Sequence, residues 1–172
     1  MKRVLFVFIF AAFFAASTVF ADHPSGFGIG VQGGAGGYWI GGFGGNAALS
    51  LKFPGVPLFW AVRLDIGHGG FGLGISGDQY LIDSILIPGL GLHWYLGVGA
   101  GLNLKLGDPL SFGVSARLPV GLSWQPVPFL EVYMQIVPSL GVTILPSFHF
   151  PDGGWGGDLG VRIWLKPKSE RL

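Results

Sequence analysis

The feature that most constrains this chain is an alternation of apolar residues with small or polar ones, which begins just after residue 22. The run from Phe27 to Val31 shows it simply, because its odd positions are apolar and its even positions are glycine. A period of two is the period of a β-strand, in which successive side chains point to opposite faces. The alternation, interrupted by glycine and proline, predicts eight strands over residues 27–31, 46–53, 58–66, 71–82, 90–101, 110–124, 129–138 and 158–165.

The predicted connections alternate in length. Residues 54–57 and 125–128 form short turns that contain proline, whereas residues 33–45 and 139–157 form long loops. Short turns at one end and longer loops at the other are typical of outer-membrane barrels, with both termini at the short-turn end. The sequence therefore predicts an all-β fold, an eight-stranded antiparallel up-and-down transmembrane β-barrel over residues 22–165.

The predicted strands have an apolar face and a second face opposite it, and the second face distinguishes two kinds of barrel. A soluble barrel of the lipocalin type turns its apolar face inward and needs a charged outer face. Here only 11% of the residues are charged, and the second face is mostly glycine, serine and alanine. A narrow eight-stranded lumen accommodates such small residues and a few charges. The membrane barrel is favoured, and a soluble periplasmic lipocalin-like carrier of an apolar ligand stays as an alternative.

The charged residues within the predicted strands share this second face. Those expected to form a lumen charge network are Arg63, Asp65, Asp78, Arg117, Glu131 and Arg162. Counting from the periplasmic strand ends places Glu131 beside Arg162 and Asp78 beside Arg63. The same count places Asp65 at the depth of Arg117 across the barrel. Because the lumen has room only for side chains, we expect these pairs to close it, so that the protein is not an open porin.

The chain begins with a different pattern. Lys2 and Arg3 precede an apolar run from Val4 to Ala16, and small residues surround a cleavage point after Ala21. These three regions predict a signal peptide over residues 1–21 and export to the outer membrane, with residues 166–172 as a short periplasmic tail. An uncleaved anchor helix is the alternative, and the lack of stop-transfer charges after the run disfavours it.

Several chemistries are disfavoured by composition and spacing. The chain has no cysteine, which removes thiolate metal sites and cysteine nucleophiles, and its net charge of +1 gives no basic surface for nucleic acid. Gly28 to Gly33 matches a dinucleotide-binding string, but more glycine follows where that motif needs a helix. The histidines lack metal-ligand spacing. We expect no cofactor, no metal and no nucleic-acid partner.

His93 with Ser76 or Ser115 is the candidate for a catalytic role, because some eight-stranded outer-membrane barrels modify lipid. Lumen histidines and serines more often complete hydrogen-bond networks. We expect the chain not to be an enzyme, and a lipid-modifying barrel enzyme stays as the alternative.

The last long loop is the best candidate for binding at the cell surface. Its candidate residues are Phe148, His149, Phe150, Asp152 and Trp155. Exposed aromatic side chains often anchor protein partners. The alternative is that they cover the barrel mouth or lie at the lipid interface. Expected partners are outer-membrane lipid, the barrel insertion machinery and an extracellular protein ligand, with the protein itself a monomer.

Four stretches resemble a known family. They are Arg63-Leu-Asp-Ile-Gly, Leu92-His-Trp-Tyr-Leu-Gly, Ala116-Arg-Leu-Pro-Val-Gly-Leu-Ser-Trp-Gln-Pro and Phe148-His-Phe-Pro-Asp-Gly-Gly-Trp-Gly-Gly. They are similar to the small OmpA-like outer-membrane barrels of spirochaetes, a family mostly of unknown function, over most of residues 25–165. The resemblance implies an eight-stranded barrel without a peptidoglycan-binding domain and carries over no catalytic residues. We expect a membrane-structural or surface-interaction role, such as adhesion or host-factor binding.

Overall fold

The computed structural model describes residues 26–39, 41–67 and 70–165, and the predicted signal peptide and periplasmic tail lie outside these residues. The described residues form nine β-strands: β1 (Phe27–Tyr38), β2 (Phe43–Lys52), β3 (Leu58–Gly67), β4 (Gly70–Ile87), β5 (Leu92–Leu106), β6 (Ser111–Arg117), β7 (Val120–Val127), β8 (Leu130–Leu145) and β9 (His149–Leu165). None of these residues belongs to a helix with the length and hydropathy to cross a membrane.

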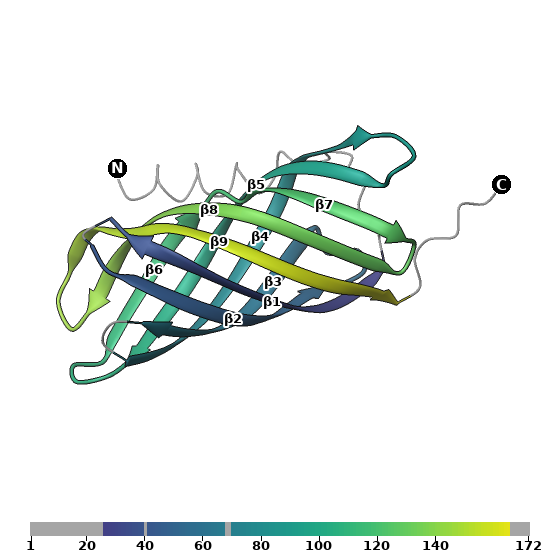
Figure 1. Cartoon of the computed structure of the whole chain (residues 1–172). Helices are drawn as coiled ribbons and strands as arrows, with labels where there is room; N and C mark the ends of the chain where they lie inside the picture. Colours follow the sequence, from purple (N-terminus) through teal and green to yellow (C-terminus); the bar gives the residue numbers. More distant parts are fainter. Residues whose placement is uncertain (1–25, 40, 68–69, 166–172) are drawn as a thin grey trace.

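The strands close into a barrel (Figure 1). The strands from β1 to β5 pair antiparallel in chain order, β8 pairs antiparallel with β9, and β1 pairs antiparallel with β9, so the sheet closes on itself. β6 and β7 share one place in this ring, because both pair with β5 on one side and with β8 on the other. The ring therefore has eight places, and the predicted eight-stranded antiparallel up-and-down barrel is confirmed.

A proline divides the sixth predicted strand into two. Pro119 lies between β6 and β7 and has no N–H to give to the ladder. The pairing continues around it, because the Gly97 N–H donates to the Pro119 carbonyl (2.8 Å) and the Leu118 N–H donates to the Pro138 carbonyl (3.0 Å). The interruption therefore leaves the ring closed.

The long loops expected over residues 33–45 and 139–157 are wrong. β1 pairs with β2 from Gly28 to Gly37, and only residues 39–42 connect the two strands. β8 and β9 likewise pair almost to their ends, and residues 146–148 connect them. Glycine-rich segments lack the apolar markers of a strand, yet the ladder is made by backbone groups that glycine supplies as well as any residue. Connections are consequently short at both ends of the barrel.

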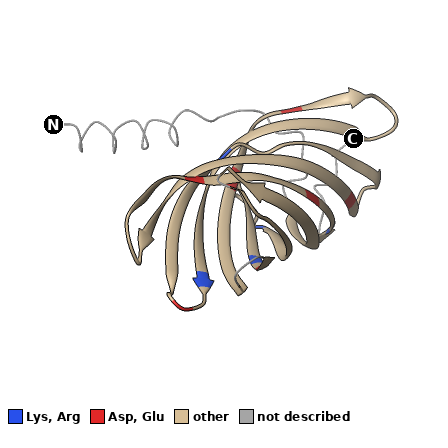
Figure 2. Cartoon of the chain, turned by 60° about the vertical axis from the view of Figure 1, so that its left-hand side comes forward, with Lys and Arg blue, Asp and Glu red and all other residues tan. Residues whose placement is uncertain are grey.

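The two faces of the barrel differ as the alternation predicts. Along β8, Glu131, Tyr133 and Gln135 are buried, whereas Met134 and Ile136 are exposed. The outward side chains of the strands are mostly large and apolar, and Figure 2 shows how few charged positions the barrel carries. The lumen is therefore the core of the protein, and this core is polar and aromatic.

Candidate functional site

The lumen is organised by rows in which a glycine separates two longer side chains. Gly99 stands between Asp78 on β4 and Arg117 on β6, opposite both in the sheet register. The Arg117 guanidinium reaches across Gly99 and donates to both Asp78 carboxylate oxygens, at 3.0 and 3.2 Å. A Cβ on Gly99 would clash with the Asp78 carboxylate. The missing side chain is thus what lets strands two places apart join.

The same arrangement recurs around the barrel. The rows, each joined by a hydrogen bond over its central glycine, are Tyr133–Gly160–Gln32, Arg162–Gly30–Ser50, Asp158–Gly34–Asn46, Arg63–Gly74–Asn103 and Tyr95–Gly121–Gln135. In the last row, a Cβ on Gly121 would lie 2.5 Å from the Tyr95 ring. The glycines at alternate strand positions therefore leave room for side chains from the neighbouring strands to lie across the inner wall.

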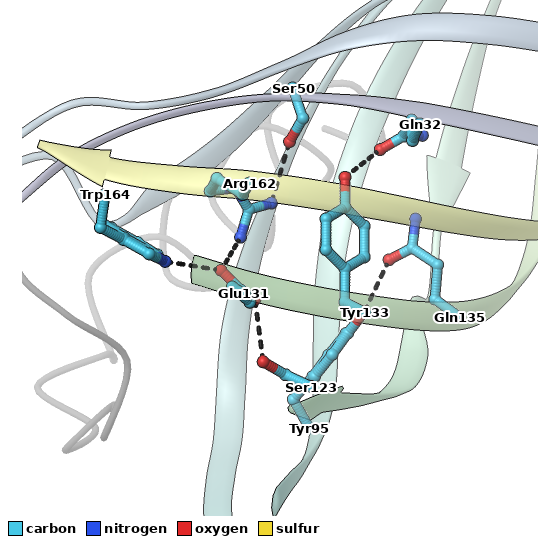
Figure 3. Close-up of polar contacts among 9 residues, drawn as sticks. All are labelled: Gln32, Ser50, Tyr95, Ser123, Glu131, Tyr133, Gln135, Arg162 and Trp164. Carbon is cyan, nitrogen blue, oxygen red and sulfur yellow. Dashed lines mark hydrogen bonds and ion pairs between the residues drawn. The ribbon is translucent and has the colours of Figure 1, made fainter. Parts of the chain in front are cut away.

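A buried polar cluster around Glu131 closes the half of the lumen nearer the termini (Figure 3). Arg162 lies directly opposite Glu131 in the register and donates to its carboxylate at 2.7 Å. Ser123 donates to the same carboxylate at 2.9 Å, and the Trp164 indole N–H donates at 2.8 Å. Arg162 also donates to the Ser50 hydroxyl at 2.9 Å. Carboxylate and guanidinium are both buried, and the carboxylate accepts three hydrogen bonds.

Aromatic rings surround this pair. The Arg162 guanidinium lies over the rings of Tyr133 (4.6 Å to the centroid) and Phe59 (4.7 Å). Phe59 begins a stack that continues to Tyr80 at 4.1 Å and from Tyr80 to Tyr95 at 4.2 Å. Eight strands leave an interior just wide enough for side chains, and the faces of these rings stabilise the cation that they enclose. The cluster and the stack form a continuous plug, which we call the lumen plug.

The structure pairs the remaining predicted charges differently from expectation. Asp78 was expected beside Arg63, and it binds Arg117 instead. Asp65 was expected opposite Arg117, and it lies 2.8 Å from the Arg63 Nε on its own strand. The physical reason is that depth along a strand does not determine these contacts, because they cross a glycine or link two residues of one strand.

Beyond the plug, the lumen opens into a cavity of about 200 Å³ at the end away from the termini. Arg63, Asp65, Arg117 and Asp158 are among its lining residues. Asp158 is held by Asn46 at 3.2 Å and by Gln135 at 3.1 Å. The Asp158 carboxylate in the cavity wall is therefore already engaged by hydrogen bonds within the barrel.

The predicted binding loop is mostly strand. Among its residues only Phe148 lies in a connection, because β9 begins at His149. Phe148, Phe150 and Trp155 are exposed, whereas Asp152 accepts hydrogen bonds from Thr143 (2.5 Å) and from the Gly153 N–H (2.8 Å). The aromatic side chains thus project from a paired hairpin.

The candidate catalytic pairs, His93 with Ser76 and His93 with Ser115, are far apart. Ser76 and Ser115 both lie opposite Gly101, eight positions along β5 from His93. At about 3.3 Å per residue, this places each serine about 26 Å from the histidine along the strand. A proton transfer between them requires hydrogen-bond distance, so neither pair can act as nucleophile and base. Among the described residues, no three acidic or histidine side chains gather as a metal site would require.

Several lumen residues were missed as partners by sequence reasoning. They are Gln32, Asn46, Ser50, Asn103, Ser123, Asp158 and Trp164. The alternation gives a signal that could have found them. Asp158 and Trp164, for example, lie an even number of positions from Arg162 and therefore point to the same face of the strand. The strand offset that makes them partners is a property of barrel shear, which alternation does not encode.

No protein-family model and no curated protein matches the sequence. Among solved structures, the chain is similar to Neisserial surface protein A (NspA), with a TM-score of 0.51 and 17% identity, covering 84% of this chain and 100% of that one. It is also similar to the N-terminal β-barrel domain of Pseudomonas aeruginosa OprF, with a TM-score of 0.46 and 15% identity, covering 79% of this chain and 96% of that one. At this identity the likeness to NspA shows the barrel fold alone.

Proposed function

We propose that this chain is an integral outer-membrane protein with a membrane-structural or surface-interaction role and a lumen closed to solutes. The observation that carries the proposal is a closed ring whose outward side chains are apolar and whose inward side chains are polar. In hydrocarbon every backbone polar group needs a partner within the protein, and a closed barrel supplies one. The predicted signal peptide and the resemblance to spirochaetal barrels support the same location.

The orientation follows from the even number of crossings, which puts both termini at one end. We assign that end to the periplasm and the end with residues 146–148 to the cell surface. Phe148 and Phe150 would then face outside the cell, where exposed aromatic side chains can anchor an extracellular protein. The monomeric state and recognition by the insertion machinery belong to this proposal.

The inner face argues for a non-catalytic barrel that carries no apolar ligand. The lumen holds the Glu131–Arg162 and Asp78–Arg117 ion pairs, and charged groups of this kind disfavour the apolar ligand of a lipocalin-like carrier. A continuous pore would have to pass through the half of the lumen nearer the termini, and the lumen plug occupies that half.

Fractionation of cells tests the proposal. We expect the protein in the outer-membrane fraction, and we expect the unheated form to migrate faster than the boiled form in mild SDS gels, because a closed barrel resists detergent. Recovery of a monomer in buffer without detergent would overturn the membrane assignment. Altered lipid A or phospholipid on deletion of the gene would favour the enzymatic alternative instead.

A further inference from the structure

The cavity at the end of the lumen away from the termini, which we call the vestibule, is reached from solvent. Tyr38 at the end of β1 and Lys105 near the end of β5 line it, and both side chains are exposed. The volume of the vestibule is about 200 Å³, whereas a single water needs only about 10–15 Å³ by the same measure. The vestibule therefore has room for a solute larger than water.

Charges of both signs line the vestibule. The lining residues include three cations and three carboxylates, which are Arg63, Lys105, Arg117, Asp65, Asp152 and Asp158. Arg117 is already paired with the Asp78 carboxylate, and Arg63 with the Asp65 carboxylate. Strong attraction of an ion needs a cleft in which one sign predominates, and here neither sign does. The electrostatics of the wall therefore suit a neutral polar ligand.

Three polar side chains of this wall each leave one polar atom without a partner among the described residues. Asn46 donates through Nδ2 to Asp158, which leaves its buried Oδ1 unpaired. Asp65 contacts Arg63 through Oδ1, and Asn103 accepts from Arg63 through Oδ1, which leaves the Asp65 Oδ2 and the Asn103 Nδ2. A carboxylate only accepts and a guanidinium only donates, so these contacts fix the orientation of both amides.

The sheet register gathers these three side chains around two glycines. Asn46 on β2 lies directly opposite Asp65 on β3, and Asp65 lies opposite Gly72 on β4. Asn103 on β5 lies opposite Gly74, two residues along β4 from Gly72. A Cβ on Gly72 would lie 3.8 Å from the Asp65 Oδ2, so the glycine leaves the space beside this oxygen open. The patch thus offers two spare acceptors and one spare donor.

We propose that the vestibule binds a small neutral polyol, of the chemical class of a sugar, through Asn46, Asp65 and Asn103. A hydroxyl group both donates and accepts, so neighbouring hydroxyls can donate to the Asn46 and Asp65 oxygens and accept from the Asn103 amide. Such a ligand also satisfies the buried Asn46 Oδ1, which is costly to leave unpaired. The chemistry is the same for a free sugar and for the terminal sugar of a glycan. The proposal goes beyond the proposed function and needs neither the membrane nor the assigned orientation.

A titration followed by NMR tests the site. The mature chain is held in micelles of an amine-oxide detergent, because glycoside detergents carry the proposed ligand chemistry. The probes are D-glucose, D-galactose and myo-inositol, and the side-chain amide signals of Asn46 and Asn103 are followed. We expect at least one probe to shift both signals in a saturable way. A methyl glycoside that binds like the free sugar shows that the site also admits a terminal sugar, and one that does not bind assigns it to free sugars.

Two isosteric substitutions reverse the spare atoms and keep the Oδ1 contacts with Arg63. Asp65→Asn turns a spare acceptor into a donor, and Asn103→Asp turns the spare donor into an acceptor. Read at the Asn46 signal, each should weaken binding of the responding probe by about tenfold or more. Asp108→Asn makes the same change at an exposed position outside the vestibule and should keep the affinity. Each variant is checked for the heat-dependent gel shift, so that either site variant can carry the test if the other fails to fold.

Three results would overturn the inference. No saturable shift with any of the probes would mean that the vestibule holds water only. A stronger response to acetate or to methylammonium would mean that the site takes an ion. An equal loss of affinity in Asp65→Asn and Asp108→Asn would place the binding outside the vestibule.

Discussion

Replacing Glu131 with leucine tests the energetic role of the buried pair. The Glu131 side chain is 0% exposed and accepts hydrogen bonds from Arg162, Ser123 and Trp164, at 2.7, 2.9 and 2.8 Å. Leucine removes this acceptor and leaves the buried Arg162 guanidinium without a carboxylate. Breaking a buried ion pair by removing one partner costs about 3–5 kcal/mol.

The groups around Arg162 place the expected decrease in the free energy of unfolding near the lower end of that range. Its guanidinium keeps the hydrogen bond to Ser50 at 2.9 Å and the faces of Phe59 and Tyr133. A desolvated cation–π contact contributes about 2 kcal/mol, so the cation is partly compensated after the carboxylate is gone. We therefore expect Glu131→Leu to lower the free energy of unfolding by about 3 kcal/mol.

The assay is urea unfolding in detergent micelles, followed by tryptophan fluorescence and by the gel shift. Arg162→Leu alone should also destabilise, because it leaves the Glu131 carboxylate buried with two neutral donors. The double variant Glu131→Leu, Arg162→Leu should lose less than the sum of the singles, by up to about 3 kcal/mol of coupling. Additive losses would refute the reasoning, because they would mean that the two side chains stabilise the barrel independently.

Three further predictions follow from the rows, the plug and the hairpin ends. Gly99→Ala should lower the free energy of unfolding by about 1–3 kcal/mol, because its Cβ would collide with Asp78, whereas Gly157→Ala should not, because its nearest atom is 3.9 Å away. Purified protein in a planar bilayer should show no large steady conductance, and such a conductance would mean that the lumen plug is open. Chymotrypsin added to intact cells should cut at Phe148 and spare Phe53 in the turn at the opposite end; the reverse pattern would invert the proposed topology.

The sequence predicts the fold of this chain far better than its lumen contacts. Alternation is a property of each single strand. It therefore predicts that Glu131 and Arg162 point into the lumen, and it predicts the number of strand positions in the ring. The contact of Asp78 with Arg117 depends on the offset between three strands, which no single strand records. The long loops were overpredicted for a related reason, because Gly33 to Gly37 carry no apolar marker although their backbone is fully paired.

The glycine rows also bear on how the barrel closes. β1 and β9 are the first and last strands of the ring, and they meet at a seam that no turn connects. Three rows cross this seam, through hydrogen bonds of Tyr133 to Gln32, Arg162 to Ser50 and Asn46 to Asp158, between residues 101, 112 and 112 positions apart. Contacts between such distant residues are slow to form, because the chain between them must first be ordered. The side chains that cross Gly160, Gly30 and Gly34 can therefore form these three hydrogen bonds only when the ring is complete, and a sheet that has not closed lacks them.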